Sequence, residues 1–312
     1  MGEPKVADEK IHRLLKEFER RSVENALRNF HVYDTRPTVE ALVKRARQLG
    51  PAGIEDLRRV LAPESDVSSY CALGAARALT ELEDGGTLGL VIYQAARIWD
   101  RCVEKGAEIG GGGFNSFLVE ARKLIPHALR SGPLPEGVIE TLSIFVDGVS
   151  DWRATGAVFE TAAVSGDPRL RDALIQVASH SLSDIRRADA VYALRHYPGL
   201  QATVLEAVND PKDRIASAAA KALVEMLNLV PGCGEEDFER WETWAMRQVP
   251  PELQPEKPRG LGRLLRRQPV YDHHQKLFWA ACRSAHQGAV QERSRSDMRR
   301  AAREEVEAAR RW

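Results

Sequence analysis

A mixed set of aromatic and basic side chains offers the clearest chemistry for gripping a partner. The set accompanies three alanine-rich motifs, AARAL at 75–79, AVYAL at 190–194 and AAKAL at 219–223. The Ala, Ala and Leu at the first, fourth and fifth positions share one helical face, so the third position projects sideways. The third positions of the three motifs are Arg77, Tyr192 and Lys221, and Arg195 directly follows the second motif. A weaker copy of the motif ends at Thr161 and places Phe159 at the corresponding position. Such a ridge could hold an acidic peptide or a phosphate backbone, and a solvated helix face is the alternative.

Histidine and cysteine side chains near the C-terminus could contact a metal ion. Cys282 and His286 are four residues apart and share a helical face, but His274 lies two turns before Cys282. A structural zinc site needs four ligands, so we expect no metal here. Four glycines at 110–113 precede a predicted helix but lack the lysine and hydroxyl of a nucleotide-binding loop, so we predict a connecting loop and no cofactor.

A basic segment provides the second candidate binding surface. Residues 259–312 hold 13 Lys or Arg against 6 Asp or Glu, a net charge of +7, and the rest of the chain, 32 against 39, carries −7. In the first part of this segment Arg259, Arg263, Arg266 and Arg267 surround three leucines. The combination could contact nucleic acid or an anionic membrane surface, and a solvated basic linker is the alternative.

The elements that carry these side chains are predicted to be short paired helices. Leu194 and Leu223 lie 29 residues apart, and Thr161 precedes Leu194 by 33. A period near 30 residues accommodates two helices with their turns and is typical of a solenoid. Asp167-Pro168 and Asp210-Pro211 each place a capping acid before a proline suited to the first helical turn.

The same stretches resemble the HEAT-repeat family, particularly its short bacterial form. Three runs followed by alanine-rich stretches are similar to the Asp and Arg at the start of that family's second helix: Asp151-Trp152-Arg153, Asp184-Ile185-Arg186-Arg187 and Asp213-Arg214. The resemblance covers 136–228 and 51–82, although Ser68-Ser69-Tyr70 replaces the Asp and Arg in the latter. It implies an α-solenoid that binds another macromolecule on its concave face.

One enzymatic interpretation follows from this resemblance. Some HEAT-like proteins are DNA glycosylases in which tryptophans flank a cleft Asp, and the chain offers Trp99-Asp100 and Asp151-Trp152. The −7 charge outside the basic segment works against tracking a phosphate backbone. The sequence has no Ser-His-Asp or paired-carboxylate constellation with usable spacing.

We therefore predict an all-α chain with four regions: an N-terminal helical cap (1–36), a HEAT-like solenoid (37–249), a Pro/Gly-rich basic linker (250–270) and a basic helical extension (271–312). Phe238, Trp241 and Trp244 are expected to seal the end of the solenoid. Truncation after Pro258 is expected to leave the repeats folded, since the linker marks a boundary.

Scattered cysteines and the lack of a long apolar segment favour a cytoplasmic protein with no membrane span. The expected function is a non-catalytic scaffold for another protein, and the alternative is nucleic-acid binding through the extension, including base excision.

Overall fold

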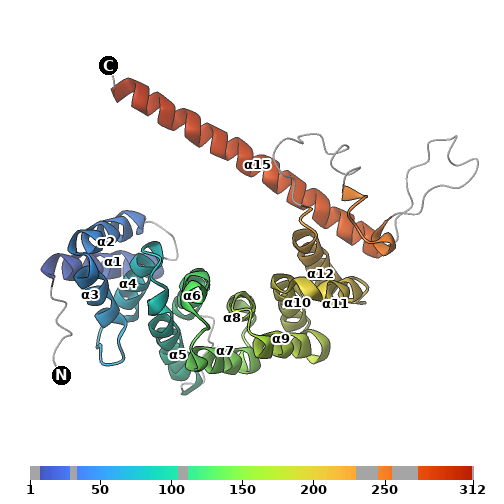
Figure 1. Cartoon of the computed structure of the whole chain (residues 1–312), viewed down its shortest axis with the longest axis horizontal. Helices are drawn as coiled ribbons and strands as arrows, with labels where there is room; N and C mark the ends of the chain where they lie inside the picture. Colours follow the sequence, from blue (N-terminus) through green and yellow to red (C-terminus); the bar gives the residue numbers. More distant parts are fainter. Residues whose placement is uncertain (1–7, 29–33, 105–111, 230–244, 255–272, 311–312) are drawn as a thin grey trace, which may run out of the picture. The chain divides into compact units, whose positions relative to one another are not determined.

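Every regular element of the described chain is helical, which confirms the all-α prediction (Figure 1). The computed structural model describes residues 8–28, 34–104, 112–229, 245–254 and 273–310. None of the helices in these ranges has both the length and the hydropathy that a bilayer crossing requires. The chain forms two compact units, residues 1–176 and 177–312, and the boundary falls inside the helix α9 (Pro168–His180).

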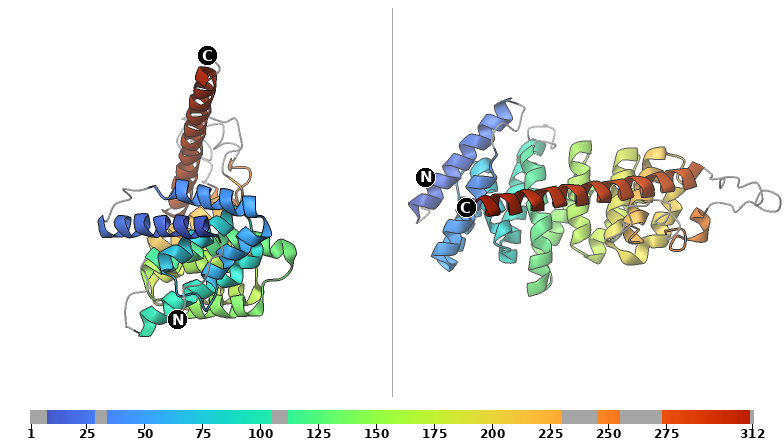
Figure 2. Two further views of the ribbon diagram at one scale, coloured as in Figure 1. Left: turned by 90° about the vertical axis from the view of Figure 1, so that its left-hand side faces the viewer. Right: turned by 90° about the horizontal axis from the view of Figure 1, so that it is seen from above.

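The first unit consists of helices that pack mainly on their neighbours in sequence. Its elements are α1 (Glu9–Arg28), α2 (Arg36–Leu49), α3 (Pro51–Leu61), α4 (Ser69–Glu81), η1 (Gly85–Thr87), α5 (Leu88–Glu104), α6 (Gly112–Ser131), α7 (Glu136–Gly148) and α8 (Trp152–Val164). Consecutive helices pack as the pairs α3 with α4, α5 with α6 and α7 with α8, each pair forming a helical hairpin. Like helices of successive hairpins also touch, since α4 packs on α6 and α6 on α8, whereas α5 packs on α3 and α7 (Figures 1 and 2).

Small residues allow these helices to approach closely. Ala75, Ala78 and Leu79 are buried, as the motif register predicts, and so are Ala190, Ala193, Leu194, Ala219, Ala222 and Leu223 in the second unit. A Cβ atom on Gly74 of α4 would lie 3.0 Å from the ring of Phe18 on α1. The glycine therefore allows α1 to pack closely on α4. The weaker copy is the exception, because Phe159 is wholly buried and does not belong to an exposed ridge.

The two predicted Asp-Pro caps behave differently. Asp167 caps α9 as expected, because its carboxylate accepts a hydrogen bond from the Arg169 backbone N–H at 2.8 Å and Pro168 is the first helical residue. The Asp210 prediction is wrong, since α12 begins at Asp213 with Lys212 as its N-cap. Asp210 instead accepts hydrogen bonds from the Lys212 backbone at 2.9 Å and from Arg187 Nη2 at 2.6 Å, which ties the start of α10 to the turn before α12.

The second unit is centred on α12. Its elements are α10 (Asp184–Ala193), η2 (Leu194–His196), η3 (Pro198–Leu200), α11 (Gln201–Val208), α12 (Asp213–Met226), η4 (Pro251–Leu253) and α15 (His273–Arg310). The helices α10, α11 and α15 all pack on α12. Its alanine-rich sequence explains this position, because small side chains leave room for several neighbours.

The start of α15 is part of this packed body. Phe278, Trp279 and Cys282 are fully buried, and Trp279 Nε1 donates a hydrogen bond to the Leu253 carbonyl at 3.0 Å. Residues 250–254, predicted as the first part of a linker, therefore form a turn that docks on α15. Truncation after Pro258, expected from the sequence to leave the repeats folded, would uncover the face of α12 that α15 contacts, so the structure leads us to expect a loss of stability instead.

Several predicted features lie outside the described residues. These are the glycine run except for Gly112 and Gly113, the aromatic group Phe238, Trp241 and Trp244, and the basic cluster Arg259, Arg263, Arg266 and Arg267.

Candidate partner-binding groove

A groove of about 1070 Å³ lies between α2, α4 and α6 of the first unit. Its apolar part consists of Val39, Val43 and Val119. Val119 is 37% exposed although it is a large hydrophobic residue, so an apolar surface is open to solvent here. The remaining lining residues are polar or charged: Thr35, Arg36, Glu40, Lys44, Arg47, Gln48, Arg77, Glu81, Glu120 and Lys123.

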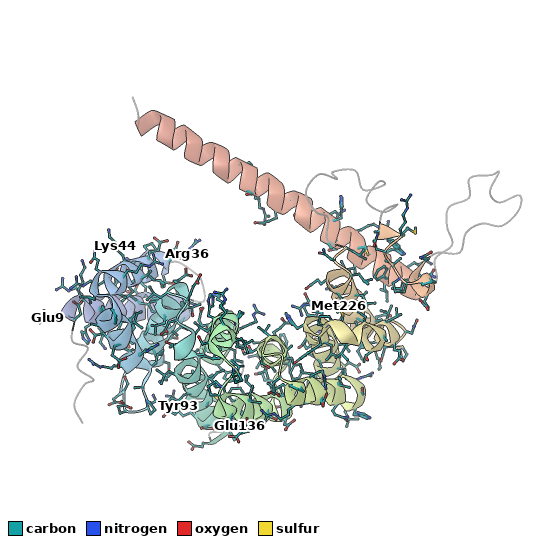
Figure 3. The ribbon with its side chains drawn as sticks, in the orientation of Figure 1. Glu9, Arg36, Lys44, Tyr93, Glu136 and Met226 are labelled. Atoms are coloured by element: carbon teal, nitrogen blue, oxygen red, sulfur yellow. The ribbon has the colours of Figure 1, made fainter. Side chains whose placement is uncertain are left out.

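Among the described residues that line the groove, basic side chains outnumber acidic ones, five against three. Arg36 and Lys44, both on α2, are marked in Figure 3. Arg36 is neutralised by Asp34, whose carboxylate accepts from Arg36 Nε at 3.0 Å. Lys44 and Arg47 are exposed and make no side-chain hydrogen bond or ion pair within the described ranges. These two cations are therefore available to a bound anion.

A buried carboxylate, Glu120, lies beneath the basic side chains. Its side chain is 5% exposed, and it sits 3.1 Å from Lys123 Nζ and 3.7 Å from Arg77 Nε. Burying a carboxylate costs free energy unless it is paired, and these two cations provide that pairing for Glu120. The adjacent hairpin repeats the arrangement, since Arg122 Nη1 lies 3.5 Å from the largely buried Glu160.

Arg77 differs from the other partly buried arginines of this unit. Arg58 is saturated by Asp84, with Nε and Nη2 donating to separate carboxylate oxygens at 2.9 and 2.6 Å, and Arg45 is similarly held by Asp8. Arg77 donates one long hydrogen bond, from Nη1 to Thr35 Oγ1 at 3.4 Å, and its guanidinium lies 5.5 Å from the Phe18 ring centre. Among the described residues no carboxylate accepts a hydrogen bond from Arg77, so most of its N–H donors remain available.

The other predicted ridge residues lie in the second unit, where two of them are already engaged. Arg195 stacks 3.8 Å from the ring centre of Tyr192 and donates from Nε to Glu225 Oε2 at 2.7 Å. The Tyr192 hydroxyl donates to the other oxygen of Glu225. Lys221 is exposed and precedes Glu225 by one helical turn. The contacts of Tyr192 and Arg195 join α10, η2 and α12.

Trp99 and Asp151, one residue from each tryptophan-aspartate pair, have structural roles. Trp99 is buried in an aromatic cluster with Phe114 and Phe145, at ring-centre distances of 5.6 and 5.0 Å. Asp151 is the N-cap of α8 and accepts a hydrogen bond from the Arg153 backbone at 2.9 Å. Trp152 is 60% exposed and has the Arg153 guanidinium 5.5 Å from its ring centre. The buried position of Trp99 leaves it unable to flank a substrate in a cleft.

Two cysteines and one histidine, Cys71, Cys282 and His286, are buried in the core. Cys282 and His286 are both buried near the start of α15. In the described portion of the chain no three His, Cys, Asp or Glu side chains are grouped so that they could hold a metal. Burial raises the pKa of the Cys71 thiol to about 11, and the nearby Glu19 carboxylate acts in the same direction. At neutral pH this thiol is therefore protonated and a poor nucleophile.

The motif register predicts Arg77 but not the α2 wall of the groove. Val39 and Val43 are four residues apart on α2, as are Glu40 and Lys44, so the sequence does contain an amphipathic helical pattern at this position. That pattern predicts a buried helix face. It does not reveal that the valines lie at the edge of a groove facing Val119, because this depends on how α2 packs against α4.

Comparison of the sequence with protein-family models found no match, and searches of curated proteins and of solved structures found no significant match either.

Proposed function

We propose that this protein is a non-catalytic scaffold of HEAT-like repeats that binds another protein in the groove between α2, α4 and α6. The observation that carries the proposal is the groove itself, where an exposed apolar surface is bordered by Lys44 and Arg47, two cations that no described side chain neutralises. Protein-binding sites commonly combine an apolar centre with a polar rim.

The packing of the first unit supports the repeat interpretation. Each hairpin presents one helix to the equivalent helix of the next, as α4 does to α6 and α6 does to α8. Stacking of this kind, together with the period near 30 residues, is what a solenoid requires. The burial of the alanine faces in both units fits the same scheme.

Nucleic-acid binding through the C-terminal extension is the alternative function. The net charge of +7 over 259–312 favours it, and Lys276, Arg283 and Arg295 are exposed on α15. Such binding would weaken steeply with salt, since each phosphate contact releases counterions.

Site-specific photocrosslinking separates the two functions. A photoreactive phenylalanine analogue is placed at Val119 in the groove or, as a control, at Ile144 of α7, which is 60% exposed and lies outside the groove lining. In lysate of the native host, we expect Val119 to give a protein adduct that persists after nuclease treatment and Ile144 to give none. Adducts at both positions, or at neither, would contradict a partner site in the groove. Loss of the adduct on nuclease treatment would favour the alternative.

A further inference from the structure

We propose that the groove recognises an acidic peptide segment with an apolar anchor residue, and that Arg77 receives one of its carboxylates. This inference rests on the proposed function, which assigns the groove to a protein partner, and it specifies the chemistry of that partner.

Contacts with Phe18 and Thr35 orient Arg77 towards the groove before any partner binds. The Phe18 ring and Thr35 hold its guanidinium, and its side chain is 35% exposed. The Glu120 carboxylate nearby is too distant for a hydrogen bond, at 3.7 Å from Nε. A planar guanidinium binds a carboxylate best through two parallel hydrogen bonds, and the fork of Arg77 is not occupied in this way. Preorganisation lowers the entropic cost of binding.

The surroundings of Arg77 favour a ligand that is both acidic and apolar. Lys44 and Arg47 offer charge to further carboxylates, and Val119, which is exposed beside the buried Val39 and Val43, offers an apolar surface for an aliphatic side chain. The groove lining carries five cations against three acids, whereas residues 1–176 as a whole carry 23 against 26. Positive charge is therefore concentrated at the groove in a unit that is net acidic, which would steer an acidic segment to it.

A nucleic acid fits this groove less well. The acidic Glu40 and Glu81 lie within the lining and would repel a continuous phosphate backbone. The described residues that line the groove also include no aromatic side chain on which a base could stack. An acidic peptide can instead place its carboxylates at Arg77, Lys44 and Arg47 and its apolar residue at the valines.

An unbiased selection tests the proposal while the identity of the partner is still open. Short random peptides displayed on phage are selected on the full-length protein, and phage that do not bind are washed away. The remaining sequences are expected to be enriched in Asp and Glu around one or two aliphatic residues. Enrichment of basic or neutral sequences, or no enrichment over the unselected library, would overturn the proposal.

Synthetic versions of the enriched peptides then measure the role of each residue by fluorescence anisotropy. We expect Arg77→Gln to weaken binding about tenfold or more, because it removes a charged pair of hydrogen bonds. Arg77→Lys should also weaken it, since a lysine cannot form the fork, and Val119→Asp should abolish it through charge repulsion at the apolar surface. Arg130→Gln is the matched control: Arg130 is 70% exposed on α6 but does not line the groove, so binding should be unchanged.

Equal effects of the Arg77 and Arg130 substitutions would overturn the proposal, as would displacement of the peptide by single-stranded DNA of the same net charge at equal concentration. Circular dichroism of each variant shows that the fold is retained. The proposed function can survive this failure, because a nuclease-resistant adduct at Val119 would still place a protein partner in the groove.

Discussion

Arg77 of the first unit and Arg195 of the second differ in how far the protein itself satisfies them. The motif pattern predicts both on the same ridge because each adjoins an alanine-rich motif. Arg195 is held by Tyr192 and by a hydrogen bond to Glu225 at 2.7 Å, whereas the nearest contact of Arg77 with a described carboxylate is 3.7 Å. Arg195 therefore contributes to the contact between α10 and α12, and Arg77 retains donors for a ligand.

The difference shows that helical register identifies where a side chain projects but not what it meets there. Glu225 lies 30 residues after Arg195, close to one repeat period, so the partner of Arg195 comes from the following hairpin. Arg77 has Glu120 of α6 in a comparable place, but Lys123 also pairs with that carboxylate at 3.1 Å. Competition from a second cation leaves Arg77 less engaged.

The largest expected effect concerns the alanine faces that both units share. Ala78→Glu, Ala190→Glu and Ala219→Glu each place a carboxylate at a position with no exposed surface, so we expect losses above about 3 kcal/mol in the free energy of unfolding. Lys221→Glu is the control, since it introduces the same side chain at an exposed position of α12. Thermal melting by circular dichroism is the measurement, and melting temperatures close to wild type for the alanine variants would show that the register is misassigned.

Truncation of α15 distinguishes the second unit from the first. Ending the chain after Pro258 removes Phe278 and Trp279 from α12, and we expect the second unit to lose about 3 kcal/mol or more. Ending it after Val290 keeps these residues and should leave the unfolding transition unchanged. Hydrogen exchange of α12 measures both, and equal protection in the two truncated proteins would contradict the role given to α15.

Paired substitutions test the two arginines directly. Arg195→Gln should lower stability by about 1 kcal/mol, because it leaves Glu225 without its guanidinium, and the partial exposure of Glu225 limits the loss. Arg77→Gln should cost less than about 0.5 kcal/mol, since its own contacts are long. Urea unfolding compares the two variants. The reverse order of stabilities would mean that Arg77 is the structural residue.

Acid sensitivity provides the smallest effect. The hydrogen bond with Arg45 lowers the pKa of Asp8 below its ordinary value of 3.8, so the ionised form stabilises the folded state above pH 3.8. This contribution is lost as the pH falls through the lowered pKa. We expect Asp8→Asn to be less stable than wild type at pH 7 and to approach it as the pH falls below about 3.8. Urea unfolding at pH 7 and at acidic pH checks this. A difference in unfolding free energy between Asp8→Asn and wild type that does not change with pH would contradict the assignment.

The helices are predictable from the sequence because their signals are local. Apolar residues at helical spacing, the buried alanine faces and the Asp167 cap all appear in short windows. Asp210 shows the limit of such signals: its side chain also accepts a hydrogen bond from Arg187, which lies 23 residues earlier in the chain. The groove depends on the same kind of distant contact, since it requires α2 and α6 to lie on either side of Arg77. Its position could not be read from any one helix.

The described side chains of α15 change from buried to exposed along the helix, and this has a mechanical consequence. Trp279, Cys282 and His286 are buried near its start, whereas Arg295 and Met298, farther along the same helix, are exposed. Residues 287–310 extend about 36 Å beyond His286, the last buried side chain among those described, at 1.5 Å per residue. The described side chains that anchor α15 on its neighbours lie in the first half of the helix, so a tilt of about 10° there would move residue 310 by about 6 Å. A small rearrangement around Trp279 would thus be amplified along the helix.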